Sequence, residues 1–574
     1  MPTADTLVEL VRQQAARFGE KTAFSFSYYG DGRGGVAVSF RELDARARGI
    51  GARLQALGVS GSPVVVVCRP GLDGIAGVVG CWYAGAVAVP VPESVGPRLS
   101  SVIADVGAGV AVVPPQLPAG VRAALAGLQL VWCATGGEDA QGWVAPAIDT
   151  DSIAVIQYSA GSTVCPRGVV LTHENLLSNV HALAAAGWGD HRDVVVSWLP
   201  THHERGLSGV VLAGIYLGCT TVVMAPSAVI SRPMCWLEAV SRWRATVTMA
   251  PDYAYRLCVQ RSTRDQREAL DMSSLATAVI SGAEPVRAAT MRAFADAFAP
   301  AGFRGEAFTP VYGRVEATLL ASGGSDSVGP QVCHADRGGL AAGWVAESPA
   351  DDPGAVAVVG CGRPRQPVAI VDPDTRLECG PDEVGEIWVG GPGVARSYWG
   401  APAQTDRIFE AFLADAGGGP FLRTGDRGFV RGGELFVVGR VPDLVMLGGL
   451  HYYSGELENA VADCHAVLLT GRGAAFADAS DRLVIVHEVR CAIGEAELDI
   501  LVQAIQSALS ESQGVQADSI LLVAPRRLPS TETGEIRRSA CRWRYLDGDL
   551  EAVAHWQGRR RPMPADLPVM TGCR

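Results

Sequence analysis

Lysine is almost absent from this sequence of 574 residues: among its 48 basic residues, Lys21 is the only lysine. A phosphate-binding loop of the G-x-x-x-x-G-K-[ST] type needs a lysine beside its glycines. Lys21 stands outside any such pattern. The sequence therefore excludes this common nucleotide-binding motif.

Positive charge is scarce as well, since the formal net charge is −12 at pH 7 and the isoelectric point is near 5.4. Proteins that bind nucleic acids or anionic membranes as a general activity carry dense positive charge. We therefore expect no nucleic-acid partner. The composition is that of an acidic soluble enzyme.

Cysteine pairs with the spacing of a metal site are missing. The sequence has 14 cysteines, but none forms a C-x-x-C pair, and Cys68 and Cys81 lie among apolar residues. Buried, reduced thiols in a cytosolic protein explain this usage. The N-terminus, with Asp5, Glu9 and Arg12 between apolar residues, predicts an amphipathic helix rather than a signal peptide. These observations predict a cytoplasmic location.

A long apolar run suited to a membrane is lacking too. Residues 74–91 carry no charge, but they are rich in glycine and alanine, contain Pro90, and are barely long enough to cross a bilayer. A buried helix followed by a core strand is the better prediction. We expect no membrane span.

What is present is an alternation of apolar β-type runs with amphipathic segments. Residues 40–57 and 99–106 have helical spacing, whereas residues 64–67 and 110–113 are expected to be buried strands. This alternation predicts an α/β fold built on largely parallel sheets. The length is too great for one hydrophobic core, so two or more domains are expected.

Residues 156–170 contain a cluster of small and hydroxyl residues that follows an apolar lead-in. Its members are Ser159, Ala160, Gly161, Ser162 and Thr163. Small residues let consecutive backbone N–H groups converge on phosphate oxygens, and hydroxyls add donors. The cluster fits an anion-binding loop, and a Ser/Gly-rich hairpin turn explains it at least as well.

Further motifs downstream bear on this choice. They are Gly282-Ala283-Glu284-Pro285, Tyr312-Gly313-Arg314-Val315-Glu316-Ala317-Thr318, Arg423-Thr424-Gly425-Asp426 and Gly439-Arg440. In this order and spacing they resemble the adenylate-forming superfamily, which activates carboxylic acids with ATP. Residues 316–324, 361–364, 384–389 and 538–542 narrow the resemblance to the fatty acyl-AMP ligases, over roughly residues 24–550.

The resemblance implies a domain plan. It consists of a large N-terminal domain (1–438) of α/β subdomains plus a small β-barrel, a hinge (439–443), and a small, mobile α+β C-terminal domain (444–554). Residues 555–574 look like a flexible tail. Pro442 occupies the hinge position, where relatives usually carry Asp or Lys. Because proline fixes φ and restricts the preceding residue, we expect limited rotation.

The resemblance also implies a site for ATP and Mg²⁺. The residues expected to contact the nucleotide are Ser159, Gly161, Ser162, Thr163, Gly282, Ala283, Glu284, Tyr312, Gly313, Asp426 and Arg440. Tyr312 would stack on the adenine, Asp426 would accept hydrogen bonds from both ribose hydroxyls, and Arg440 would reach the ribose or phosphates. A turn-stabilising aspartate is the alternative for Asp426.

Glu316 matches the family residue that helps to hold Mg²⁺, a cation that takes hard oxygen ligands. A carboxylate at a helix N-terminus, favoured there by the helix dipole, is the alternative. His203, in residues 198–207, matches a family histidine near the incoming carboxylate. A hydrogen-bonded structural histidine is nearly as good an explanation. His202 and His203 have no third ligand nearby in sequence, so they predict no zinc site.

Glu535 is the main departure from the family. Relatives that form acyl-adenylates carry a lysine there, because a carboxylate must approach the α-phosphate and a cation that touches both anions relieves their repulsion. Arg537 or Arg538 could substitute, although a planar guanidinium differs from an ammonium in geometry. Ala160 also stands where relatives usually have serine, which removes one hydroxyl donor from the loop.

Three functions remain open from the sequence. The first is an ATP-dependent acyl-AMP ligase that loads a carboxylic acid, expected to be a fatty acid, onto the phosphopantetheine arm of an acyl or peptidyl carrier protein. Coenzyme A is a less favoured acceptor. The second is a diverted relative that uses ATP on a carrier-tethered substrate, with Glu535 as a general base. The third is a non-catalytic nucleotide- or carrier-binding protein, which the retained pocket residues disfavour.

Overall fold

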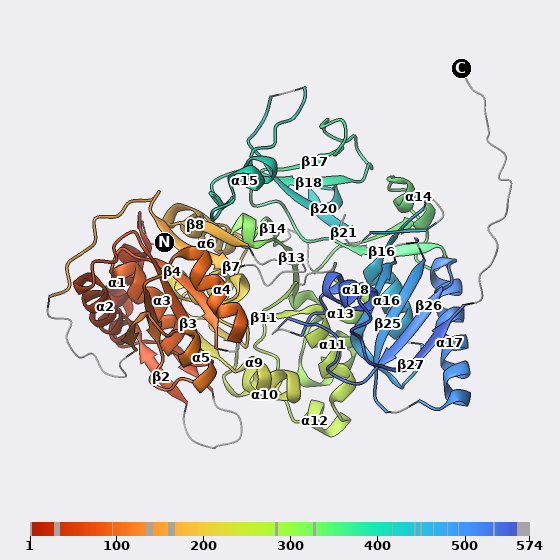
Figure 1. The fold of residues 1–574 in the computed structure, drawn as a ribbon, viewed down its shortest axis with the longest axis horizontal. Coiled ribbons are helices and arrows are strands. Elements are labelled where there is room, and N and C mark those ends of the chain that lie inside the picture. The colour runs from red at the N-terminus through yellow and green to blue at the C-terminus, as the bar shows by residue number, and fades with distance from the viewer. Residues whose placement is uncertain are drawn as a thin grey trace. The chain divides into compact units, whose positions relative to one another are not determined.

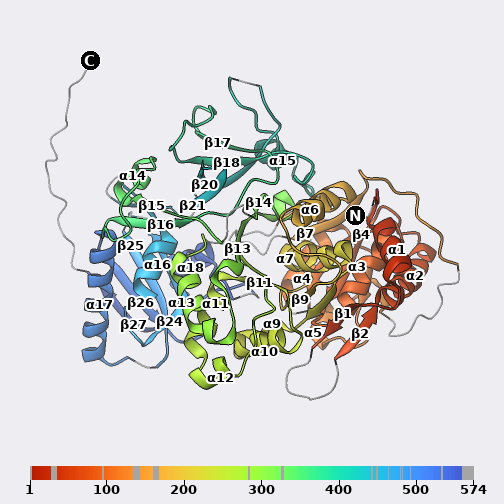
Figure 2. The same cartoon turned by 180° about the vertical axis from the view of Figure 1, so that it is seen from behind.

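The computed structural model describes residues 3–27, 35–93, 96–133, 142–158, 167–281, 285–324, 329–415, 417–440, 444–447, 450–462, 464–478, 480, 482–491, 493–531 and 534–558. The chain divides into two compact units. The first is Met1–Pro442 with Glu532–Gly534, and the second is Asp443–Thr531 with Glu535–Arg574. Figures 1 and 2 show the ribbon from opposite sides.

A seven-stranded sheet forms the first layer of the first unit. Its order is β19 (Ser397–Tyr398), β8 (Gly168–Thr172), β7 (Ile153–Tyr158), β4 (Val87–Pro92), β3 (Pro63–Cys68), β5 (Val110–Val113) and β6 (Gln129–Trp132). Five helices accompany it: α1 (Leu7–Phe18), α2 (Phe40–Ala56), α3 (Asp73–Tyr83), α4 (Gly96–Val106) and α5 (Ala119–Ala124). Figure 1 shows α1, α2 and α3 in red and orange beside β3.

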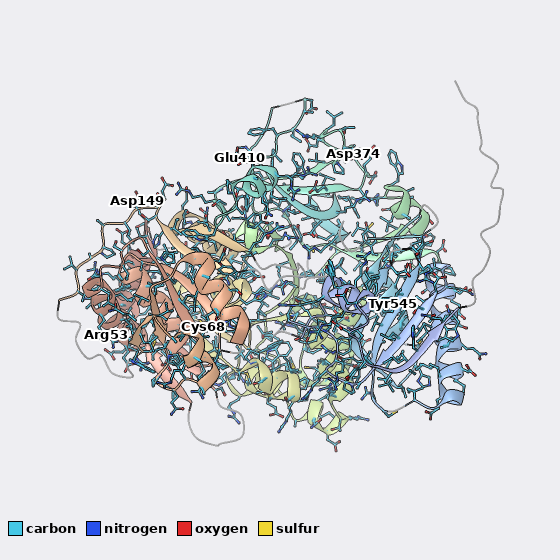
Figure 3. The ribbon with its side chains drawn as sticks, in the orientation of Figure 1. Arg53, Cys68, Asp149, Asp374, Glu410 and Tyr545 are labelled. Carbon is cyan, nitrogen blue, oxygen red and sulfur yellow. The ribbon has the colours of Figure 1, made fainter. Side chains whose placement is uncertain are left out.

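Strand β3 explains why valine dominates this sheet. Val64 and Val66 belong to the core that includes residues of α2 and α3, whereas Val65 and Val67 pack with residues of α4. Since successive side chains point to opposite faces, helices cover both faces of the sheet. Cys68, labelled in Figure 3, ends the strand and is buried.

An eight-stranded sheet forms the second layer. Its order is β14 (Ser322–Gly323), β13 (Phe308–Tyr312), β12 (Thr277–Ser281), β11 (Val247–Pro251), β9 (Val194–Ser197), β10 (Thr220–Val223), β1 (Thr22–Phe26) and β2 (Val36–Ser39). The six strands from β13 to β1 are parallel, and the two edge strands are antiparallel. Ligands of such sheets bind at the carboxyl ends of the strands, where β13 places Tyr312.

The helices of this second layer pack around aromatic side chains. They are α6 (His173–Ala185), α7 (Glu204–Gly206), a π-helix (Leu207–Leu212), α8 (Ala213–Leu217), α9 (Pro226–Ser231), α10 (Met234–Arg242), α11 (Asp252–Arg261), α12 (Arg264–Glu268) and α13 (Ala288–Phe298). Trp236 of α10, Tyr255 of α11 and Phe294 of α13 pack edge to face with centroids 5.1 Å apart. This aromatic contact fixes three helices against the sheet.

Two antiparallel sheets complete the first unit, where we expected a small β-barrel. One has the order β17 (Val368–Val371), β18 (Gly385–Val389), β20 (Leu422–Arg431) and β21 (Glu434–Arg440), and β15 (Val332–Asp336) pairs with β16 (Ala355–Val359). An isolated bridge between Gly360 and Phe436 connects them. Helices α14 (Arg337–Ala342) and α15 (Pro402–Phe409) lie in the same stretch of chain.

The second unit has a core of its own. Its sheet runs β24 (Leu468–Ala477), β25 (Leu483–Val489), β26 (Ser519–Val523) and β27 (Ala552–Gln557), and β22 (Leu444–Leu447) pairs with β23 (Leu450–Tyr453). Three helices complete it: α16 (Ser454–Ala462), α17 (Glu495–Gln513) and α18 (Arg538–Leu546). Leu457, Ile485 and Ile505 are buried in one cluster from α16, β25 and α17. Tyr545 of α18, labelled in Figure 3, packs on Phe476 of β24.

The α/β prediction is confirmed, and several local expectations hold with it. The uncharged run at 74–91 forms buried α3 and β4, and the N-terminal amphipathic segment forms α1. Helix α2 begins after a capping box in which Ser39 and Glu42 exchange hydrogen bonds of 2.7 and 3.2 Å. None of the helices in the described ranges combines the length and apolar character that crossing a bilayer requires.

Candidate active site

Gly313 turns the chain sharply at the end of β13. A Cβ here would lie 1.4 Å from the carbonyl oxygen of Leu319, so a side chain cannot fit unless that backbone moves. The turn leads into a short 3-10 helix, η4 (Val315–Ala317). It therefore sets Tyr312, which ends the strand, and Glu316, which lies in the helix, close together in one segment.

The carboxylate of Asp426 is the centre of the site. Asp426 lies in β20, paired in register with Arg440 of β21, and is 4% exposed. The Tyr312 hydroxyl donates to its Oδ2 at 2.7 Å, and Arg440 Nε donates to its Oδ1 at 2.9 Å. Arg314 Nη1 donates to both oxygens, at 3.1 and 3.0 Å. Four hydrogen bonds thus converge on one buried carboxylate.

A second buried carboxylate, that of Glu316, contacts the same arginine. Its Oε2 accepts from Arg314 Nε at 3.3 Å, and its Oε1 accepts from the hydroxyl of Tyr398 at 3.0 Å. The guanidinium of Arg167 lies over the Tyr398 ring, 5.1 Å from its centroid. Arg314 therefore bridges the two carboxylates that the sequence assigns to ribose and magnesium.

These contacts keep both carboxylates ionised. Burial is the largest influence on the pKa of Asp426 and of Glu316 and raises both, but the charge of Arg314 and the hydrogen bonds outweigh it, so each pKa lies below its usual value. Burial, and then the charge of Asp426, raise the pKa of Tyr312 well above its usual value. At neutral pH the site therefore holds two carboxylates, two guanidinium groups and a neutral phenol.

The loop at residues 392–394 is held against the site by side chains from distant segments. Asn175 of α6 donates to the carbonyl oxygens of Pro392 and Val394 at 2.8 and 2.9 Å. The hydroxyl of Thr318, a residue with a φ of 65°, donates to the carbonyl oxygen of Gly393 at 2.7 Å. Thr172 caps α6. The segment that carries Glu316 is thereby tied to α6 through this loop.

His203 lies in the first unit as the N-cap of α7. Its Nδ1 accepts from the backbone N–H of Arg205 at 3.3 Å and lies 3.0 Å from Glu204 Oε2. These contacts support the structural alternative for His203, and its role near a substrate carboxylate stays a prediction.

Glu535 lies in a hairpin of the second unit. The Thr531 N–H donates to the carbonyl oxygen of Glu535 at 2.8 Å, and the Glu535 N–H donates to the Thr531 hydroxyl at 3.0 Å. The Leu528 N–H donates to Oε1 of Glu488 at 2.9 Å. Arg472 in turn holds Glu488 through two hydrogen bonds of 2.8 and 2.9 Å. Glu535 is half-buried, and its backbone N–H and carbonyl groups are both hydrogen-bonded to Thr531.

Arg538, one of the two arginines expected to be able to substitute for the family lysine, has its partner elsewhere, and so does Lys21. Arg538 donates to both oxygens of Glu458, at 2.6 and 2.7 Å, and is 9% exposed. Lys21 Nζ donates to the carbonyl oxygen of Gly218 at 2.8 Å and to that of His191. In the eight-stranded sheet, β1 after Lys21 is five strand positions from β13, or roughly 24 Å at the usual strand spacing.

Several predicted residues lie outside the described ranges. They are Ser159, Ala160, Gly161, Ser162 and Thr163 of the phosphate loop, Gly282, Ala283 and Glu284 of the adenine segment, and Val441, Pro442 and Asp443 of the hinge. The structure brings together Tyr312, Gly313, Glu316, Asp426 and Arg440. It adds Arg314 and Tyr398, which sequence reasoning did not select. The only signal for Arg314 was its place between Gly313 and Glu316.

Glu316 has the chemistry of a magnesium ligand. Mg²⁺ prefers hard oxygen atoms and is usually held by one or two carboxylates together with substrate phosphates and water. Within the described residues, no three His, Cys, Asp or Glu side chains are grouped as a metal cluster. A single carboxylate that shares the ion with substrate phosphates still fits this mode of binding.

A hollow of about 630 Å³ lies elsewhere in the first unit. It is lined mainly by β15 and by the β20–β21 turn, with Cys333, Arg431 and Phe436 among its residues. Among the described residues, none of those predicted to bind the nucleotide lines it. We therefore place the candidate site by its converging side chains rather than by this hollow.

Known proteins resemble the chain over its whole length. The model for AMP-binding enzymes matches residues 11–399, and that for the AMP domain of Disco-interacting protein 2-like proteins matches residues 442–555. A medium-chain fatty acid–acyl carrier protein ligase of Moorena producens is 36% identical, with 97% of each chain covered. A long-chain fatty acid–AMP ligase of Mycolicibacterium smegmatis is 33% identical, with 96% of each chain covered.

A solved structure agrees with these relatives. The fatty acyl-adenylate ligase of Legionella pneumophila, in complex with acyl adenylate and pyrophosphate, superimposes with a TM-score of 0.75 at 32% identity. The match covers 97% of this chain and 98% of that one. Because the family model spans most of the chain and these relatives align along nearly its full length, the chain belongs to the AMP-binding enzyme family.

Proposed function

We propose that the protein activates a fatty acid with ATP and transfers the acyl group to the phosphopantetheine thiol of an acyl carrier protein. The observation that carries this proposal is the convergence of Tyr312, Arg440 and Arg314 on the buried carboxylate of Asp426. It occurs in a chain that aligns along nearly its full length with ligases named for fatty acids and acyl carrier protein. In the first step a carboxylate oxygen attacks the α-phosphorus of ATP, pyrophosphate leaves, and acyl-adenylate forms. In the second, the thiol attacks the acyl carbonyl and AMP leaves.

The site residues have distinct tasks under this proposal. Asp426 accepts from the ribose hydroxyls, Arg440 contacts the ribose or phosphates, and Tyr312 lies against the adenine. Burial of Asp426 favours these polar contacts, because a hydrogen bond to a charge is stronger where water is excluded. Ser159, Gly161, Ser162 and Thr163 would supply donors to the phosphates, and Gly282, Ala283 and Glu284 would line the base.

Glu316 is the residue that would hold Mg²⁺, which when bound would neutralise phosphate charge during the reaction. Tyr398 supports this role because its hydroxyl donates to Oε1 at 3.0 Å and so orients the carboxylate. His203 would lie near the carboxylate of the incoming acid. A cytoplasmic location is supported by the cysteines of the described ranges, which are all free thiols and mostly buried.

Glu535 gives a second candidate function some support. A carboxylate occupies the position at which the family resemblance implies the catalytic lysine. In the second candidate function the chain uses ATP on a carrier-tethered substrate, with Glu535 as a general base. Arg538, one of the two arginines that could substitute for the lysine, is paired with Glu458. The two candidates differ in whether a free acid is adenylated.

Release of pyrophosphate tests the first candidate. The full chain is incubated with ATP, Mg²⁺ and saturated fatty acids of increasing length, and acyl-adenylate is identified by mass spectrometry. A phosphopantetheinylated carrier protein is then added and thioester is measured. We expect turnover with a free acid and loss of roughly 100-fold in Asp426→Asn, which removes the charge that accepts the hydrogen bonds. Asp374→Asn, at an exposed position labelled in Figure 3, should be unaffected.

The Glu535→Lys variant separates the two candidates. If the natural chain releases no pyrophosphate with any free acid and Glu535→Lys does, the pocket still accepts an acid but the natural reaction is a different one. Full activity of Asp426→Asn would contradict both candidates, because each requires nucleotide bound at this carboxylate.

A further inference from the structure

Adenylation needs a cation beside the α-phosphate, and the chain has no lysine to supply it. Lys21, just before β1, donates to backbone carbonyl groups, and β1 is five strand positions from β13 in the eight-stranded sheet. Arg538 is bound to Glu458. Arg314 is different, because it lies within the candidate site and belongs to the same unit as Asp426 and Glu316.

The position of Arg314 matches one part of a nucleotide. It contacts Asp426 at 3.0 Å and Glu316 at 3.3 Å. Under the proposed function, Asp426 holds the ribose and Glu316 holds the metal at the outer phosphates. The group that joins the ribose to those phosphates is the α-phosphate. A guanidinium between the two carboxylates therefore lies where the α-phosphate is expected, and its fork of N–H donors suits phosphate oxygens.

Asp426 is also saturated as the structure stands. A carboxylate offers about four lone-pair positions, and Asp426 accepts two hydrogen bonds from Arg314, one from Arg440 and one from Tyr312. Ribose hydroxyls can donate to it only if some of these donors leave. Departure of Arg314 frees a position on each oxygen. The guanidinium stays charged, so it then has Glu316 as its remaining carboxylate partner and can accept the phosphate as a second anion.

We propose that Arg314 exchanges its ion pair with Asp426 for the α-phosphate of the bound nucleotide, and so supplies from the large unit the cation that relatives supply with lysine. This inference rests on the proposed function. Arg314 forms no covalent bond and transfers no proton. It neutralises charge on the phosphate oxygens while the acid carboxylate attacks and pyrophosphate leaves.

Binding of adenosine and of AMP isolates this contact, because the two ligands differ only by the α-phosphate. Dissociation constants of both are measured by calorimetry for the full chain and for Arg314→Met, without added Mg²⁺. We expect the preference of the natural chain for AMP over adenosine to fall by about 10- to 100-fold in Arg314→Met. Adenosine itself should bind as well or better, because Asp426 is released for the ribose.

Arg264→Met is the matched control. It removes a guanidinium that pairs with Glu268 on the surface of the same unit, with an arginine side chain that is 87% exposed, and should leave the preference unchanged. Arg314→Lys keeps the charge without the fork and should give an intermediate preference. In pyrophosphate release, Arg314→Met should lose rate by about 10²- to 10³-fold.

An unchanged preference for AMP in Arg314→Met would overturn the proposal, because Arg314 would then serve only to cap Asp426. If Arg314→Met does not fold, Arg314→Met with Glu316→Gln restores the charge balance and the same ratio is measured. Failure of the natural chain to bind either ligand would instead refute the proposed function. The two failures are therefore distinct.

Discussion

At the scale of single residues, Gly313 decides whether the site forms at all. A Cβ at this position would lie 1.4 Å from the carbonyl oxygen of Leu319. The carbonyl group of Leu319 can therefore lie against residue 313 only because that residue is a glycine, which has no Cβ. Backbone atoms, unlike the far end of a flexible side chain, cannot move aside cheaply.

We accordingly expect Gly313→Ala to lower the free energy of unfolding by about 3 kcal/mol and to abolish nucleotide binding. Chemical denaturation and AMP binding check this. Gly120→Ala is the control: it lies in α5 with nothing within 4 Å of the new Cβ, and should be neutral or stabilising by about 0.5 kcal/mol. Normal stability of Gly313→Ala would contradict the tight turn.

Arg314 shows what residue-level reasoning can miss. The motif around Tyr312 and Glu316 was evident from the sequence, and the enzyme class that it predicted is confirmed by the comparisons. Arg314 stood between them without a role. Its main partner, Asp426, is 112 positions away, so no local pattern could connect the two.

At the scale of elements, pairing of strands and helices places the functional residues. The β20–β21 hairpin puts Asp426 opposite Arg440, and the end of β13 brings Tyr312 to the same carboxylate. In the second unit, the ion pair between Arg538 at the start of α18 and Glu458 in α16 joins two helices. Both side chains are about one-tenth exposed, so the pair is protected from water.

Removal of one member of that pair leaves the other charge buried and uncompensated. We expect Glu458→Gln to destabilise the second unit by about 3–5 kcal/mol. Hydrogen exchange should rise in α16 and α18 and stay unchanged in β13. Glu268→Gln, which breaks an exposed pair with Arg264, should cost less than about 1 kcal/mol. Equal exchange in Glu458→Gln and the natural chain would show that the pair is not structurally important.

At the scale of the whole molecule, the single lysine makes an unusual test possible. Lys21 donates to two backbone carbonyl groups, and burial lowers its pKa. It joins the start of β1 to residues near β9 and β10. In this eight-stranded sheet β1 is five strand positions from β13, which carries Tyr312. Its role is therefore structural under the proposed mechanism.

A Lys21→Gln protein, free of lysine, should retain pyrophosphate release at the natural rate and lose about 1 kcal/mol of stability. Rates measured below the unfolding temperature check this, with thermal unfolding measured in parallel. A large loss of rate in a folded Lys21→Gln protein would show that Lys21 takes part in the chemistry, and would contradict the role assigned to Arg314.

The sequence by itself determined what depends on neighbours along the chain. The alternation of valine-rich strands with amphipathic helices and the order of the motifs were sufficient for the α/β fold and the family. Only the tertiary structure decided that Arg314 bridges Asp426 and Glu316, that Tyr398 orients Glu316, and that Arg538 and Lys21 are already engaged. The reason is physical: backbone periodicity and caps act over a few residues, whereas ion pairs between distant segments exist only after strand register and packing have brought their side chains together.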